Sequence, residues 1–151
     1  MGLEIVYEDD SCRQAYAGPI HVVGWFDAPR LEQMEAYGVH AQALSRRLPM
    51  TGLMNLIVRG RARFDPAVRA EAKRLTERGM HRGGTSHVIL APGLAGSAVR
   101  AFMSTTVLLG RPKHPTKVFD EIRAGARWLA ERIDIDAQRL TAECEDFVNG
   151  D

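Results

Sequence analysis

The stretch Leu53-Met54-Asn55-Leu56-Ile57-Val58 decides the fold. It is short and almost entirely apolar, and it lies between the turn Thr51-Gly52 and a basic segment that begins at Arg59. A continuous apolar run of this length is typical of a strand that is buried on both faces, as in a parallel sheet. We therefore expect a central strand here.

A helix and a further strand follow this run. Asp65-Pro66 combines a capping side chain with a proline in the first turn, which predicts a helix start. Gly79 marks the expected end of this helix, and residues 86–91 form the next expected strand. The apolar stripe of the helix consists of Val68, Ala72 and Leu75.

Three more helices and one strand are expected downstream. After the breaker Pro92-Gly93, a helix carries an apolar stripe at helical spacing, and 116–119 is a short strand. Asp120 is the expected cap of the next helix, and a last helix begins at Asp136. The three stripes are Val99, Phe102, Met103, Thr106 and Val107; then Ile122, Ala126, Leu129 and Ile133; then Leu140, Cys144, Phe147 and Val148.

Two strands and one helix are expected upstream. Residues 3–7 and 20–26 are rich in strand-forming side chains and lie close enough in sequence to form a hairpin. Asp27-Ala28-Pro29 predicts a helix start, and Pro49 ends that helix. Its expected buried face consists of Leu31, Met34, Ala41, Leu44 and Leu48.

The order of elements predicts an α/β fold with a mixed, largely parallel sheet and helices packed on it. The order is β-β-α-β-α-β-α-β-α, followed by a C-terminal helix. We expect a domain over residues 1–133 and an acidic helical extension over 134–151.

Composition excludes several classes of protein. The formal net charge of the 151 residues is +1, whereas a dedicated nucleic-acid binder normally has a basic excess. No apolar stretch approaches the ~20 residues that span a bilayer, and the N-terminus has no signal-peptide pattern. We expect a cytoplasmic protein without membrane insertion, in which Cys12 and Cys144 are reduced thiols; a disulfide between them is the alternative.

Segments in the second half of the chain carry a resemblance to a known family. They are Ser97-Ala98-Val99-Arg100-Ala101-Phe102, Pro115-Thr116-Lys117-Val118-Phe119-Asp120 and Ala126-Arg127-Trp128-Leu129. Over residues 3–133 the chain resembles the STAS family of anti-sigma-factor antagonists, and most of all its stand-alone, bacterial, SpoIIAA-like branch. The resemblance implies a non-enzymatic regulatory module that binds another protein.

The chain departs from this family at one functional position. Classical members carry a phosphorylatable serine at the start of the helix that follows the central strand. Here residues 59–66 contain neither serine nor threonine, and Asp65 occupies the expected N-cap. Asp65 is either a plain helix cap or a fixed negative charge in place of a switchable one. The phosphorylation switch is therefore not carried over.

No residue pattern predicts a catalytic or metal site. The five histidines have no zinc-site spacing, although His21 and His87 lie in strands and could approach one another across the sheet. The segment that contains Gly93, Gly96 and Ser97 lacks the ending of a phosphate loop. It could nevertheless bind an anion at a helix N-terminus, or it could be only a turn and cap.

Charge is distributed unevenly along the chain. Residues 59–82 hold eight basic side chains against three acidic ones, and residues 134–151 hold six acidic side chains against one basic. Both segments could be solvated surfaces, the acidic tail could lie near the basic patch, or the patch could receive an acidic partner.

We expect a non-catalytic regulatory or scaffolding module that uses no cofactor. Its expected partner-binding residues are Arg61, Arg63, Asp65 and Arg69. The alternatives are a domain that binds a small anionic molecule at Gly93, Gly96 and Ser97, and a small enzyme whose site carries no recognisable motif. The C-terminal helix could pack within the chain or mediate a homodimer.

Overall fold

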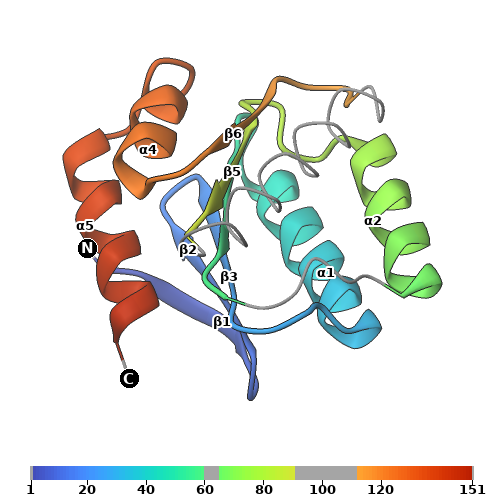
Figure 1. Ribbon diagram of the computed structural model, residues 1–151. Coiled ribbons are helices and arrows are strands. Elements are labelled where there is room, and N and C mark those ends of the chain that lie inside the picture. The colour runs from blue at the N-terminus through green and yellow to red at the C-terminus, as the bar shows by residue number, and fades with distance from the viewer. Residues whose placement is uncertain (1, 60–64, 91–111, 151) are drawn as a thin grey trace.

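A computed structural model describes residues 2–59, 65–90 and 112–150 and contains a six-stranded mixed sheet between two layers of helices (Figure 1). The strands lie side by side in chain order. The first three are antiparallel neighbours, and the third to the sixth run parallel. The strands are β1 (Glu4–Glu8), β2 (Cys12–Ala17), β3 (Ile20–Trp25), β4 (Gly52–Ile57), β5 (Thr85–Ile89) and β6 (Thr116–Phe119).

The antiparallel part of the sheet corrects the sequence prediction. Residues 3–7 and 20–26 were expected to form a hairpin, but β2 lies between β1 and β3 and pairs with both. Gly18, with a φ of 56°, begins the tight turn from β2 to β3. The run Cys12-Arg13-Gln14-Ala15-Tyr16-Ala17 lacks β-branched residues, so its composition does not mark it as a strand.

The parallel part of the sheet agrees with the α/β class that the sequence predicts. β4 lies between β3 and β5, so the run at residues 53–58 is a central strand as expected. Helix α2 (Pro66–Arg78) begins at the predicted cap Asp65. It ends at Gly79, whose φ of 60° and ψ of 57° are left-handed, a conformation that glycine adopts without strain.

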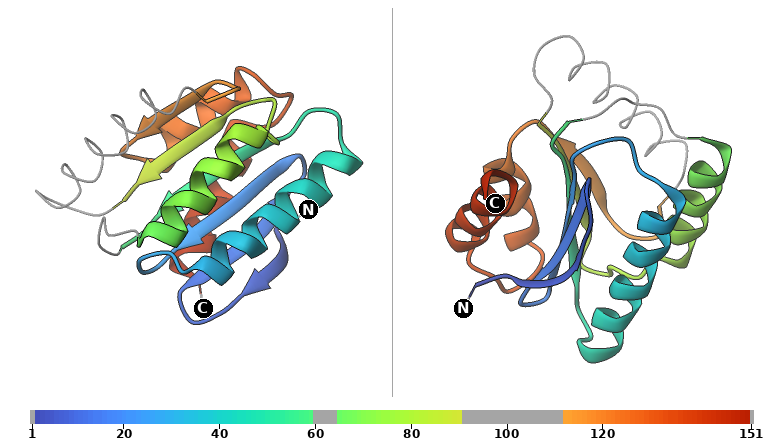
Figure 2. Two further views of the ribbon diagram at one scale, coloured as in Figure 1. Left: turned by 90° about the vertical axis from the view of Figure 1, so that its right-hand side faces the viewer. Right: turned by 90° about the horizontal axis from the view of Figure 1, so that it is seen from below.

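The two faces of the sheet are covered by different helices (Figures 1 and 2). Helices α1 (Leu31–Arg47) and α2 lie on one face, and α4 (Ile122–Ala130) and α5 (Ala137–Asn149) lie on the other. The larger apolar cluster is on the α4 and α5 face, where strand and helix residues pack together. From the strands it includes Ile20, Val22, Met54, Leu56 and Val88; from the helices it includes Ile122, Ala126, Leu129, Leu140, Cys144 and Phe147.

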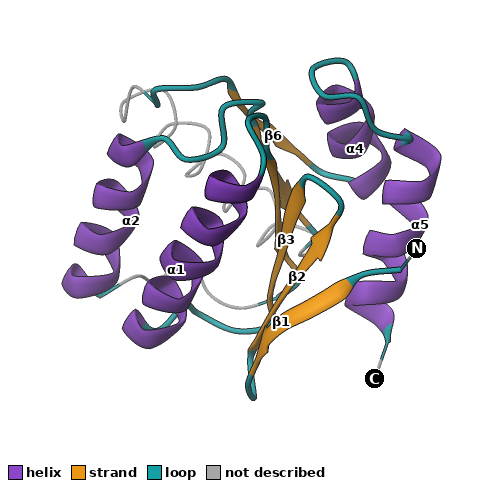
Figure 3. Cartoon of the chain, turned by 180° about the vertical axis from the view of Figure 1, so that it is seen from behind, coloured by secondary structure: helices purple, strands orange, loops and turns teal. Residues whose placement is uncertain are grey.

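The position of α5 answers two questions that the sequence leaves open. α5 packs against the sheet on the face opposite to α2, so the acidic segment does not lie near the basic helix (Figure 3). Cys12 packs in a cluster on the α1 face, whereas Cys144 packs on the α5 face, and both are free thiols. Gly24 permits the close packing of α5, because a Cβ there would lie 2.9 Å from the Phe147 ring.

Two predicted helix starts are wrong. α1 begins at Leu31 with Arg30 as its N-cap, while the Asp27 carboxylate accepts a hydrogen bond from the Ala28 backbone instead of capping the helix. Leu31 was expected to be buried but is exposed, and the buried face of α1 consists of Gln33, Gly38, Ala41 and Leu44. α4 has Glu121 rather than Asp120 at its N-cap, without a side-chain capping bond.

The Asp9 carboxylate joins the β1–β2 turn to the start of α1. It accepts hydrogen bonds from the Tyr7 hydroxyl at 2.6 Å, from the Ser11 and Cys12 backbone at 2.9 and 2.8 Å, and from the Gln33 amide at 3.0 Å. Arg30 also reaches Asp9, at 3.3 Å. Burial opposes the charge of Asp9, but the hydrogen bonds prevail and lower its pKa to about 2.

Asp9→Asn is expected to lower the free energy of unfolding by about 2 kcal/mol, because one of its two acceptor oxygens becomes a donor. Asp10→Asn is the matched control, since the Asp10 side chain is 77% exposed and its pairing with Arg30 is a surface contact. Urea denaturation followed by tryptophan fluorescence measures both. Equal losses in the two variants would contradict the role assigned to Asp9.

Candidate functional site

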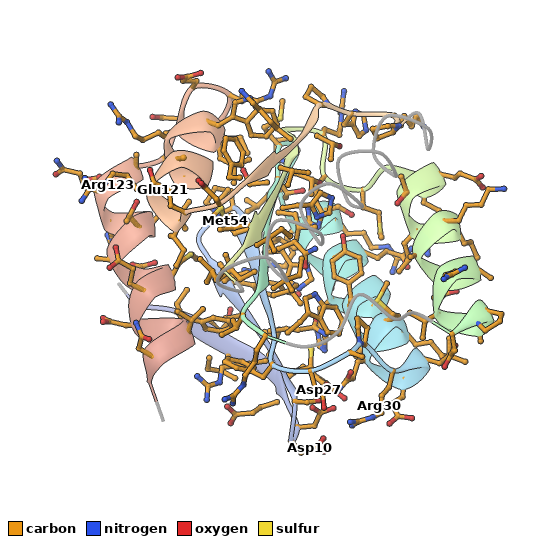
Figure 4. The ribbon with its side chains drawn as sticks, in the orientation of Figure 1. Asp10, Asp27, Arg30, Met54, Glu121 and Arg123 are labelled. Atoms are coloured by element: carbon orange, nitrogen blue, oxygen red, sulfur yellow. The ribbon has the colours of Figure 1, made fainter. Side chains whose placement is uncertain are left out.

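The predicted partner-binding segment follows the carboxyl end of β4. In an open α/β sheet, the loops after the carboxyl ends of parallel strands are the usual place for binding sites. β3, β4 and β5 end at Trp25, Ile57 and Ile89, which lie at the same edge of the sheet. Figure 4 shows Asp10, Asp27 and Arg30 together at this edge, where β3 leads into α1.

Only part of the predicted site lies in the described residues. Asp65 and Arg69 are both exposed at the start of α2. The Asp65 carboxylate accepts a hydrogen bond from the Val68 backbone at 3.0 Å, so it is a helix cap as predicted. Arg61, Arg63, Gly93, Gly96, Ser97 and the stripe from Val99 to Val107 lie outside the described residues.

A cluster of rings and guanidinium groups lies beside this edge and was not predicted. The guanidinium carbons of Arg13 and Arg59 each lie 5.8 Å from the centre of the Phe26 ring. Arg13 also donates a hydrogen bond to the Phe147 carbonyl at 2.8 Å. Its positive charge there interacts favourably with the negative end of the α5 helix dipole. Arg59 is exposed, and it extends the positive charge from α2 toward β3.

The sheet face below α1 carries buried polar side chains, of which the sequence analysis singled out His21 but not Gln14. His21 and Gln14 are fully buried, and His21 Nε2 lies 3.2 Å from Gln14 Oε1. The His21 ring stacks on Tyr37 with the ring centres 5.2 Å apart, and His81 lies 5.6 Å from His21. The sequence signal for this arrangement is the alternation of side chains along a strand, which places His21, Val23 and Trp25 on the same face of β3.

His87 does not meet His21, because Asn55 on β4 lies between their strands. Instead, Asn55 Nδ2 is 2.9 Å from His87 Nδ1, and the Trp25 indole donates to Asn55 Oδ1 at 2.7 Å. The two histidines therefore belong to separate groups on the same sheet face.

Burial keeps the three strand and loop histidines of this layer neutral. It lowers the pKa of His81 and of His87 to about 4, and the pKa of His21 well below its usual value. The neighbouring histidines His81 and His40 lower the pKa of His21 further. Neutral imidazoles offer one donor and one acceptor each, which suits hydrogen bonding rather than ion pairing.

Other features of the described residues do not coincide with the predicted site. No group of three or more His, Cys, Asp or Glu side chains is placed to hold a metal ion within residues 2–59, 65–90 and 112–150. An open hollow of about 560 Å³ lies at the other edge of the sheet, between the β2–β3 turn and the start of α5. None of the helices in those ranges is long and apolar enough to cross a membrane.

Acid is expected to destabilise the fold through the buried histidines. Between pH 6.5 and pH 4 the buried histidines bind protons in the unfolded chain but stay neutral in the folded protein. The free energy of unfolding therefore falls as the pH falls. The expected slope is about 1.4 kcal/mol per pH unit for each histidine that stays neutral. Urea titrations at four pH values measure it, and a flat profile would contradict the burial of neutral imidazoles. His87→Gln is expected to reduce the slope.

Asp65→Ala is expected to lower the free energy of unfolding by about 1 kcal/mol, because α2 loses its cap. If Asp65 is only a cap, the variant binds its partner as the wild type does at a temperature where both are folded. Thermal unfolding and partner binding are measured on the same preparations. Weaker binding by the folded variant would instead assign the charge of Asp65 to the interface.

Comparisons of the chain with models of protein families, with curated proteins and with solved structures found no match. The assignment of a function therefore depends on the geometry described above.

Proposed function

We propose that the chain is a non-enzymatic, STAS-like module that binds the acidic surface of another protein through α2 and the end of β4. The observation that carries this proposal is the exposure of α2. Of its 13 residues only Val68 and Leu75 are buried, and the helix lies between the carboxyl end of β4 and the start of β5.

The packing of α2 explains this exposure. α2 rests on α1, and the approach is close because a Cβ at Gly38 would lie 2.8 Å from Leu75 Cδ2. One apolar contact line is enough to hold the helix, so most of its surface is left for solvent or a partner. A surface helix that is held at a fixed position can present charges to a partner with little loss of entropy.

The charges on α2 favour an acidic partner. Arg74 pairs with Glu71 at 2.5 Å, and Lys73 lies 3.9 Å from Glu77, so these charges are partly offset within the helix. Arg69 and Arg78 form no salt bridge with any described residue, although the charge of Arg78 contributes, with Arg74, to lowering the pKa of Glu71. Together with Arg59 they provide positive charge that can steer an acidic surface toward this side of the molecule.

The family resemblance supports the same surface. The resemblance implies that the start of the helix after the central strand is the regulatory contact, and here that position is Asp65. Because residues 59–66 contain neither serine nor threonine, the proposed module binds without a phosphorylation switch at the start of this helix.

Arg69→Glu is expected to weaken partner binding at least tenfold, because it reverses an exposed charge at the centre of the proposed surface. Arg123→Glu is the matched control, since Arg123 is an exposed residue of α4 on the opposite face (Figure 4). Both variants change the net charge equally. Partners captured from a lysate of the source cell are quantified for the wild type and for both variants, at low and high salt.

The proposal requires a protein that Arg69→Glu loses and Arg123→Glu retains, with capture that weakens as salt is added. Equal capture by both variants, or capture that salt does not affect, would overturn it.

A further inference from the structure

An open hollow lies at the edge of the sheet where β3 begins, away from the edge where β4 ends and the proposed protein-binding surface starts. Its volume of about 560 Å³ falls within the range of small-molecule sites. The walls come from the start of β1, the β2–β3 turn, the end of α1 and the start of α5. The apolar residues that line it are Tyr16, Ala17, Pro19, Ile20, Ile135 and Leu140. An apolar part of a ligand can therefore be covered here.

The apolar lining is held in place by the core of the domain. Ile20 and Leu140 belong to the large apolar cluster between the sheet and α5, and Ile135 packs against that cluster. Tyr16 is buried, and its hydroxyl donates a hydrogen bond to the His40 carbonyl at 2.7 Å. The hollow is therefore present before a ligand arrives, and binding does not require these side chains to become ordered.

Acidic side chains outnumber basic ones around the hollow. Arg139 donates a hydrogen bond to Glu143 at 2.9 Å, so these two charges offset each other. The Asp136 carboxylate caps α5, because it accepts from the Gln138 and Arg139 backbone at 3.0 and 3.1 Å. The charged lining residues are Glu4, Asp134, Asp136 and Glu143 against Arg47 and Arg139. This excess of negative charge favours a cationic ligand over an anionic one.

Two of these carboxylates are available to a ligand. Glu4 and Asp134 are exposed, and neither forms a salt bridge with any described residue. Glu4 is directly opposite Tyr16 in the β1–β2 register, so its charge is on the strand next to the aromatic ring. Asp134 precedes α5 and lines the hollow from that side. A positive group in the hollow therefore has carboxylates on two different walls.

The chain itself places a cation against the aromatic wall of the hollow. Arg47 is the last residue of α1, and its guanidinium carbon lies 5.8 Å from the centre of the Tyr16 ring. The face of an aromatic ring attracts cations electrostatically. Arg47 is exposed and forms no salt bridge within the described ranges, so a ligand can displace it from the ring without breaking an ion pair there.

We propose that this hollow binds an organic cation, namely a primary amine that carries an apolar group. The ammonium lies near the carboxylates of Glu4 and Asp134. It replaces the Arg47 guanidinium over the Tyr16 ring, while the apolar group packs on the apolar lining. The site is independent of the protein-binding surface proposed on α2. It also differs from the anion site predicted at residues 93–97, because it selects the opposite charge.

The probe is 2-phenylethylamine, an alkyl amine that is protonated at pH 7. Its counterpart is 3-phenylpropionate, which has the same phenylethyl group and the opposite charge. Binding is followed at pH 7 and low salt through the backbone amides of Gly18, Ile135 and Leu140 in two-dimensional ¹H–¹⁵N spectra. The amine is expected to shift these resonances saturably, with 3-phenylpropionate at least tenfold weaker. Absence of a saturable shift, or an affinity for 3-phenylpropionate within tenfold of that for the amine, overturns the proposal.

Arg47→Ala tests whether the hollow is the site. The substitution removes a competing cation from the Tyr16 ring and a like charge from the lining, so the amine is expected to bind at least about threefold more tightly. Arg46→Ala is the matched control, because Arg46 is an exposed residue in the same last turn of α1 that does not line the hollow. Equal affinities of the two variants would assign the effect to net charge alone and would overturn the proposal.

The double variant Glu4→Gln, Asp134→Asn is expected to bind the amine about tenfold more weakly, since each exposed carboxylate contributes about threefold. Its control is Glu145→Gln, Asp146→Asn, which removes two exposed charges of α5 outside the hollow. Wild-type affinity in the first double variant, or an equal loss in the second, overturns the proposal. Arg69→Glu is expected to bind the amine normally, which separates this site from the protein-binding surface. The same spectra report whether each variant is folded.

Discussion

The hydrogen bonds of the Asp9 carboxylate are the constraint on which the arrangement of the first half of the chain depends. They join a turn between two antiparallel strands to the first turn of α1, and they use donors from both. This junction fixes how α1 lies across β2 and β3. The position of α1 in turn fixes α2, which packs on α1. A carboxylate that is 22% exposed thus determines where the charged helix is presented.

The two faces of the sheet use different physical means to hold their helices. On the α4 and α5 face, the contact between strands and helices is made mainly by apolar side chains, and buried Ser86 donates one hydrogen bond to the Gly125 carbonyl of α4. On the α1 face, Gln14, His21 and Asn55 replace aliphatic residues, so packing depends on directional bonds. Such bonds are costly to leave unmade, and they specify one arrangement of α1. The same face is also the one that acid weakens.

The sequence predicted elements whose signals are local and failed where the structure depends on partners. Residues 53–58 and the cap at Asp65 were predicted because hydrophobicity and capping act within a few residues. β2 was missed because its strand character comes from neighbours on both sides, not from its composition. The sequence predicts Asp27 as the helix cap. In the structure, the side chains of Arg30 and Gln33 at the start of α1 donate hydrogen bonds to the carboxylate of Asp9, which is distant in sequence. Of the candidate site, the sequence predicted Asp65 and Arg69. The hydrogen bonds from Trp25 to Asn55 and from Asn55 to His87 could not be predicted, because they depend on the register of three neighbouring strands.

The late position of α4 and α5 in the chain has a consequence for synthesis. All six described strands are made before residue 122, yet within the part of the chain that the structure describes, the helices that cover the apolar face of the sheet lie in residues 122–149. A nascent chain that has already paired its strands therefore exposes Val22, Met54 and Val88 to the cell until α5 leaves the ribosome. The α1 face is covered much earlier, because α1 follows β3 directly. Chaperone contact during translation is thus expected at one side of the sheet only.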